Sequence, residues 1–142
     1  MVPRSRKWTG DTGGTAVIEF AILTPVFLLM LTGMLAYGIY FGAAHALQQL
    51  AADAARTAIA GINAPEGRRL VESYLRRNAG DYMLIDYQKL DFRLTEPDTG
   101  DDQYRLTLVY DATDLPIWNL YPPLPLPETQ IVRGASIRRG GI

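Results

Sequence analysis

The chain has 142 residues, of which 48% are hydrophobic and 20% are charged, and its formal net charge is −1. This length allows one modest domain together with a membrane segment. The near-neutral charge argues against nucleic acid as a partner. The lack of cysteine excludes a disulfide framework and a thiolate metal site. With His45 as the single histidine, a histidine-based metal cluster or catalytic triad is not expected, and neither is a cofactor.

An uncharged stretch begins at Phe20 and continues to Ala52. Its first part, residues 20–44, exceeds the roughly 20 residues that cross a bilayer as a helix. Transfer of its large apolar side chains contributes on the order of −3 to −7 kcal/mol, which outweighs one acid at the boundary. The positive-inside rule predicts a cytoplasmic N-terminus and an extracytoplasmic C-terminal domain, because basic residues precede the span: Arg4, Arg6 and Lys7.

The residues before the span form a short basic leader that ends in Gly13-Gly14. Glu19 lies five residues after Gly14, at the mouth of the membrane segment, where a carboxylate is costly and is expected to have a use. Three interpretations stay open: cleavage after Gly14, an uncleaved anchor, and secretory cleavage after Ala46. The third has a small-x-small pattern at residues 44–46, but the apolar run is far longer than the roughly 7–15 residues of a secretory signal core.

The run EFAILTPVFLLMLTGMLAYG, with its Glu-Phe pair and internal proline, resembles the TadE-like minor pilins (pseudopilins) of the tight-adherence, or Flp-type (type IVb/IVc), pilus. The resemblance covers residues 13–42. It implies a class III signal that a prepilin peptidase of the bacterial inner membrane cuts between Gly14 and Thr15. It also implies that Glu19 then compensates the Thr15 α-ammonium of an adjacent subunit. The implied partners are the peptidase, other pilin and minor pilin subunits, and pilus assembly platform proteins.

Two further features of the span concern its shape and packing. Pro25 lacks a backbone donor and crowds the carbonyl of Ala21, so a helix kink is expected there. Gly38, Gly42 and Ala46 form a stripe of small residues, spaced four apart, that would let another helix approach closely. Such stripes also arise by chance in apolar sequence, so a packing role and an incidental pattern both stay open.

Beyond the membrane, the first helix is expected to continue as an amphipathic stalk. Residues 43–60 are rich in alanine and hold no glycine or proline. Their apolar members recur at helical spacing: Leu47, Leu50, Ala51, Ala54 and Ala58. A second helix is predicted to begin at Asn63, because Pro65 suits the first turn and Glu66 completes a capping pattern. Gly80 is expected to end it.

Two segments with alternating apolar residues predict an antiparallel hairpin, residues 86–95 and 103–111. The acidic residues 96–102 form the turn between them. Residues 115–127 carry five prolines and are expected to form a rigid loop, after which residues 129–138 return as a last strand. The predicted fold is therefore α+β: a long N-terminal helix, a short second helix and a small antiparallel sheet, as in a pseudopilin head.

These assignments divide the chain into a leader (1–14), a transmembrane helix (15–46) and an extracytoplasmic α+β domain (47–142). The acids of residues 96–102 fit a solvated turn better than a calcium loop. The arginines of the second helix fit a solvated face better than a ligand site: Arg68, Arg69, Arg76 and Arg77. The sequence has no phosphate loop, nucleophile elbow or metal-spaced His/Glu pair, so no enzymatic activity is expected.

The favoured function is thus a minor pilin that primes or caps a fibre and stays in the inner membrane until it joins the extracellular pilus. The alternative is a single-pass membrane adaptor that is never cleaved, whose outer domain binds a pilus or secretion assembly component.

Overall fold

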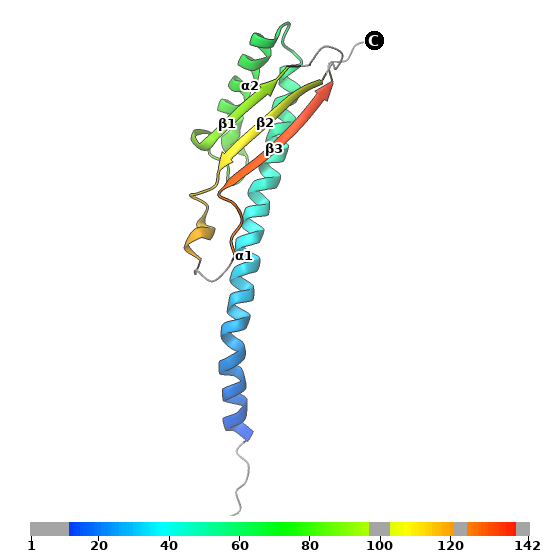
Figure 1. The fold of residues 1–142 in the computed structure, drawn as a ribbon. Coiled ribbons are helices and arrows are strands. Elements are labelled where there is room, and N and C mark those ends of the chain that lie inside the picture. Colours follow the sequence, from blue (N-terminus) through cyan, green and yellow to red (C-terminus); the bar gives the residue numbers. More distant parts are fainter. Residues whose placement is uncertain (1–11, 97–102, 121–124, 139–142) are drawn as a thin grey trace, which may run out of the picture.

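The computed structural model describes residues 12–96, 103–120 and 125–138. Helix α1 (Thr12–Ala58) has 47 residues and is about 70 Å long at 1.5 Å per residue. Figure 1 shows it as one rod, with the remaining elements gathered as a head on its C-terminal half. The head contains one α-helix, three strands and three 3₁₀ turns among the described residues: α2 (Ala64–Asn78), η1 (Ala79–Asp81), η2 (Tyr87–Lys89), β1 (Leu90–Thr95), β2 (Gln103–Asp111), η3 (Pro116–Asn119) and β3 (Gln130–Arg138).

The C-terminal half of α1 packs against the head through alanine and leucine. Leu47 and Leu50 are fully buried, and so are Ala51 and Ala54. Their spacing places them on one face of the helix, and this face contacts α2, β2 and β3. The predicted apolar stripe is confirmed. Because most of its members are small, the sheet and α2 approach the backbone of α1 closely.

Helix α2 begins where the capping residues predict. The Asn63 side-chain oxygen accepts a hydrogen bond from the Glu66 amide at 3.0 Å, and the Glu66 carboxylate accepts one from the Ile62 amide at 2.9 Å. The prediction that Gly80 ends this helix is wrong. The helix ends at Asn78, whose side-chain amide donates to the Tyr74 carbonyl at 2.8 Å, and Gly80 lies in the following turn, η1.

The sheet is an antiparallel meander in the order β1-β2-β3. Across β1 and β2, Phe92 pairs with Leu108 and Leu94 with Leu106, and every second residue of β2 is buried against the helices. The predicted hairpin and returning strand are confirmed. Strand β1 starts later than residue 86, because the Asp86 carboxylate accepts from the Gln88 amide at 2.9 Å and closes the turn η2.

The connection between α1 and α2 depends on two glycines. A Cβ on Gly61 would lie 2.5 Å from the backbone nitrogen of Gly67, and a Cβ on Gly67 would lie 3.0 Å from the carbonyl oxygen of Ala58. Only glycine avoids the first of these clashes without moving the backbone. The two helices can therefore turn back on each other within a few residues.

Among the described residues, the end of the head nearest the N-terminal half of α1 is formed by η3 and the segment that starts at Pro125 (Figure 1). Ala36 of α1 is fully buried there, and the Tyr37 hydroxyl donates to the Pro125 carbonyl at 2.6 Å. The Trp118 ring nitrogen donates to the Ala112 carbonyl at 2.6 Å, and an ion pair joins Lys89 to Asp114. The head thus begins on α1 at Ala36, and the observed architecture is the predicted α+β fold.

Candidate functional site

The N-terminal half of α1 carries the residues that the sequence singles out, and it is bare. Thirteen large apolar side chains from Val17 to Leu35 are exposed, and the head covers none of them. A surface patch of this size on a monomer marks contact with a membrane or with another protein. The candidate site is therefore the bare N-terminal half of a long apolar helix.

Gly14 and Thr15 lie in the first turns of α1, which begins at Thr12. Both residues are exposed, and a Cβ added to Gly14 would meet no atom within 4 Å. Glycine is about 1 kcal/mol less favourable than alanine inside a helix, so the pair Gly13-Gly14 weakens this end. The predicted cleavage bond is therefore exposed and lies next to two residues of low helix propensity.

Glu19 is the one charged residue of α1 between Thr12 and Ala52. It is exposed and makes no ion pair with any residue of the described ranges. It lies four residues after Thr15, on the same face of the helix, and helical side chains lean towards the N-terminus. The carboxylate thus belongs to the helix face that holds Thr15, and its exposure leaves it accessible to a cation from outside this chain.

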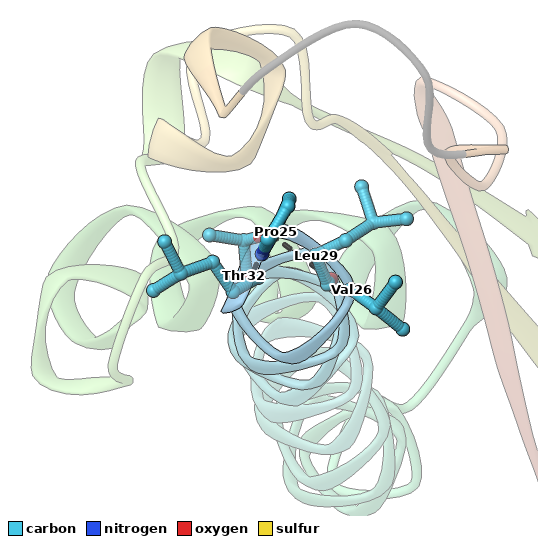
Figure 2. A pocket seen from close by; sticks show the side chains of 5 residues that line it. Pro25, Val26, Leu29 and Thr32 are labelled. Carbon is cyan, nitrogen blue, oxygen red and sulfur yellow. Dashed lines mark hydrogen bonds between the residues drawn. The ribbon is translucent and has the colours of Figure 1, made fainter. Parts of the chain in front are cut away.

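Pro25 lies inside α1, which stays helical on both sides of it. The Thr24 hydroxyl donates to the Phe20 carbonyl at 2.6 Å, so a side-chain hydrogen bond is made one residue before the missing proline donor. Pro25 borders a shallow hollow of about 460 Å³ lined by apolar residues and Thr32. Figure 2 shows the labelled side chains projecting outward from α1. The hollow suits an apolar chain or helix; the kink stays a prediction.

The small-residue stripe is divided between two surroundings. Ala46 is buried under the head, and a Cβ on Gly42 would lie 3.9 Å from the Leu84 side chain, in ordinary contact with the head. Gly38 faces open space. The head therefore covers the stripe at Ala46, while Gly38 and Gly42 are exposed, and a role in packing against another helix stays a prediction.

The arginines of α2, which the sequence analysis considered as a ligand site, make structural contacts. The Arg68 guanidinium lies 5.7 Å from the centre of the Phe92 ring, and the Arg77 side chain donates to the Ser73 carbonyl at 3.2 Å. These contacts attach α2 to β1 and satisfy its last turn. Most of the acidic loop 96–102 lies outside the described residues, so calcium binding there stays untested.

A polar network that the sequence analysis missed joins α1 to the turn after α2. The Asp53 carboxylate accepts from Arg56 at 2.6 Å and from the Tyr82 hydroxyl at 2.8 Å, and the Tyr74 hydroxyl lies 3.4 Å from that of Tyr82. Burial, followed by the hydrogen bonds to Tyr74 and Asp53, raises the pKa of Tyr82 above its ordinary value of 10.0. The spacing of Asp53 and Arg56 was visible in the sequence, but the tyrosines join through tertiary contact.

The bare apolar helix and the compact head together define a single-pass membrane protein. Within the described ranges, one helix is long and apolar enough to cross a membrane. Compared with known families, residues 14–56 match the TadE-like proteins. The match starts at Gly14, includes Glu19 and Pro25, and ends inside α1, so the predicted resemblance to TadE-like proteins is confirmed over that segment. No curated protein and no solved structure matches the chain.

Proposed function

We propose that the chain is a minor pilin, or pseudopilin, that a prepilin peptidase cuts between Gly14 and Thr15 and that is needed to assemble a tight-adherence pilus. The observation that carries this proposal is Glu19, a lone carboxylate on the bare apolar half of α1, one helical turn after Thr15. The match to TadE-like proteins over residues 14–56 supports it. The protein acts as a structural subunit and not as an enzyme.

Cleavage begins at the weakest part of α1. A peptidase needs an extended scissile bond, and Gly13-Gly14 lets the first turn open at low cost. The bond lies at the cytoplasmic end of the span, because the basic residues of the leader hold that end inside. Cleavage removes those charges and leaves Thr15 with a new α-ammonium group, while the head remains on the extracytoplasmic side.

The new α-ammonium group of Thr15 gives the Glu19 carboxylate a partner. Two unit charges 4 Å apart attract by about 4 kcal/mol at an effective dielectric constant of 20, and an unpaired charge in a dry helical interface is strongly destabilising. When the bare halves of neighbouring subunits pack together and exclude water, Glu19 compensates the Thr15 ammonium of an adjacent subunit. The pairing thus favours one axial alignment of the subunits and disfavours others.

The cleavage step is tested with Gly14→Ala. We expect processing to fail, because the peptidase pocket implied by the resemblance accepts little beyond the Cα atom. The fold is unaffected, since the added Cβ meets no described atom. Gly38→Ala is the matched control, an exposed glycine of the same helix that also faces open space. N-terminal sequencing of membrane-extracted protein reads the outcome, and a normal Thr15 terminus in Gly14→Ala refutes the assignment.

The assembly step is tested with Glu19→Gln, which keeps the size of the side chain and removes its charge. Membrane insertion should be intact or slightly improved, because a costly group is gone, and cleavage should continue. Incorporation into pili should fall sharply. Comparing cleaved protein with pilus-borne protein in the same cells separates the two steps. A cleaved Glu19→Gln chain present in pili at the wild-type level shows that charge pairing is not the mechanism.

The second candidate is an uncleaved single-pass adaptor that binds an assembly or secretion component. One observation favours it: α1 continues without a break across the Gly14–Thr15 bond. The first residue of the mature chain discriminates between them, since the adaptor keeps the leader. Release after Ala46 fits the structure poorly, because that bond lies within α1 between two residues buried under the head, Ala46 and Leu47.

A further inference from the structure

The described segments at the end of the head nearest the bare half of α1 carry no charged side chain of their own. Residues 115–120 and 125–127 hold no acidic or basic side chain, and neither do residues 20–52 of α1. The charges of the described head nearest to this end border it: Asp114 and Glu128 flank the segment in the sequence, and Arg133 lines a hollow with Phe41 of α1. Asp114 is engaged by Lys89.

Aromatic and apolar side chains collect at the same end. The rings of Tyr37 and Phe41 lie 6.1 Å apart, and so do those of Tyr40 and Phe41. Phe41 is 54% exposed. Trp118 and Leu120 pack at the edge of the core and are partly exposed. We call this surface the membrane-proximal face and define it by Tyr37, Tyr40, Phe41, Trp118, Leu120 and Pro125.

The length of the bare helix brings this face to the edge of the bilayer. Val17 to Leu35 is 19 residues, or about 28 Å of helix, close to the roughly 30 Å hydrocarbon thickness of a membrane. No linker follows, because Ala36 is already buried and the Tyr37 hydroxyl is bonded to the Pro125 carbonyl at 2.6 Å. A span of residues 17–35 therefore leaves η3 and Pro125 at the depth of the lipid headgroups.

We propose that the membrane-proximal face docks on the lipid bilayer, so that η3 and the Pro125–Tyr37 contact rest in the interfacial layer. Tyrosine and tryptophan favour this layer, where the ring meets hydrocarbon and the polar tip meets water. Docking holds the head at a fixed depth beside the span while the subunit waits in the membrane. The inference rests on the membrane span of the proposed function, and it is independent of cleavage and of charge pairing at Glu19.

Lipid fits the face better than a protein neighbour because the face continues the surface of the span without interruption. The described residues of the face carry no lysine or arginine. Docking should therefore be insensitive to salt and should not require anionic lipid, unlike the binding of a polybasic segment. The nearest cation on this side is Arg133, which lines a hollow together with Phe41 of the face, His45 and Gln48, and which donates to the Val132 carbonyl at 2.8 Å.

The test uses the full chain in phosphatidylcholine vesicles, with Trp8→Phe so that Trp118 is the single tryptophan. Lipids carrying a bromine or spin-label quencher near the headgroup should quench Trp118 fluorescence. The matched control carries Trp8→Phe, Trp118→Phe and Ile62→Trp, which moves the reporter to the far end of the head, where Ile62 is 81% exposed. We expect several-fold stronger quenching of Trp118 than of the Ile62→Trp reporter, at both low and high salt.

Three outcomes oppose the inference, and they are distinguishable. A chain that floats with the vesicles but shows equal quenching at both positions overturns docking and leaves the span intact. Trp118 that escapes lipid quenching, and whose emission shifts to shorter wavelength only at high protein-to-lipid ratio, shows that a neighbouring subunit covers the face. A chain that does not float overturns the span of the proposed function together with the docking.

Discussion

The two halves of α1 place their side chains in opposite ways. In the half that carries the head, the buried residues are mostly small, as at Ala43, Ala51 and Ala54, with Leu47 and Leu50 filling the space between α1 and the sheet. In the N-terminal half the side chains are large and apolar, and they are exposed. One continuous helix thus combines a C-terminal half whose apolar face is covered by the chain's own head and an N-terminal half whose apolar surface the chain leaves uncovered.

This difference assigns the stabilisation of each half to a different source. The C-terminal half is stabilised by burial within the head, at about 25 cal/mol for each Å² of apolar surface removed from water. The N-terminal half buries nothing within the chain, so its apolar surface must be covered by lipid or by other subunits. The hydroxyls of Thr24 and Thr32 are already satisfied locally, since they donate to the Phe20 carbonyl at 2.6 Å and to the Leu28 carbonyl at 2.9 Å, which suits an apolar surrounding.

The largest expected effect on the head comes from truncating a buried leucine. Leu50→Ala should lower the free energy of unfolding of the head by about 2–5 kcal/mol, because it removes apolar contacts and leaves a cavity. Leu28→Ala makes the same truncation at a side chain that is 53% exposed on the bare half and should leave this free energy unchanged. Denaturant unfolding in detergent micelles, followed by Trp118 fluorescence, measures both. Equal losses would show that the two halves form one cooperative unit.

A smaller loss is expected at the turn that joins the two helices. Gly61→Ala places a Cβ 2.5 Å from the Gly67 nitrogen, and the resulting backbone shift should cost roughly 1–3 kcal/mol. Gly80→Ala is the matched control, since its Cβ meets no described atom within 4 Å. The same unfolding measurement compares them. If Gly61→Ala is as stable as wild type, the helices do not require this close approach, and the stalk holds the head by its apolar face alone.

The packed half was the easier one to predict from sequence. The helical spacing of Leu47, Leu50 and Ala54 and the alternation along β2 reflect burial on one face, and burial is what selects such patterns. The capping pattern at Asn63 is local and was confirmed. The end of α2 was predicted wrongly. Gly80 was expected to end the helix, but the helix ends at Asn78, whose side-chain amide donates to the Tyr74 carbonyl.

The bare half of α1 and the candidate site could be predicted from the sequence only in part. The chemistry of Glu19 and the leader is legible in the sequence because a charge in an apolar run is conspicuous, yet its partners lie outside the chain. The point at which the head begins on α1 was not predictable. It depends on the contact of Tyr37 with Pro125, which are 88 residues apart. For the same reason the hydrogen bond between Tyr82 and Asp53, which are 29 residues apart, was not predicted.

A modest effect is expected when the network at Asp53 is broken. Tyr82→Phe keeps the ring and removes the hydroxyl that donates to Asp53 at 2.8 Å, so it should lower the free energy of unfolding of the head by roughly 1 kcal/mol. The substitution also changes the pH dependence. The folded state raises the pKa of Tyr82 above 10.0, so its contribution is complete below pH 10 and is lost as the pH rises further.

Unfolding measured from neutral pH to above pH 10 tests the sign. The wild-type chain should lose stability above pH 10, and Tyr82→Phe should lose less of it. Some alkaline loss should remain in the variant, because burial also raises the pKa of Tyr110. Identical alkaline profiles for the two chains would show that the hydroxyl of Tyr82 is not held in its neutral form by the fold.

The smallest effect on the stability of the head is expected from Pro25→Ala. An unchanged free energy of unfolding of the head is the informative result. Proline inside a helix costs about 3 kcal/mol when the loss is uncompensated, so the substitution should stabilise the bare half of α1 and straighten it if a kink is present. The head begins eleven residues later, at Ala36, so its free energy of unfolding should change by less than about 0.5 kcal/mol. Insertion should be unaffected, while the packing of subunits in the pilus should change.

A measurable shift in the unfolding of the head would show that the halves of α1 are mechanically coupled. An unchanged pilus number and diameter would show that the shape of α1 at Pro25 has no part in assembly.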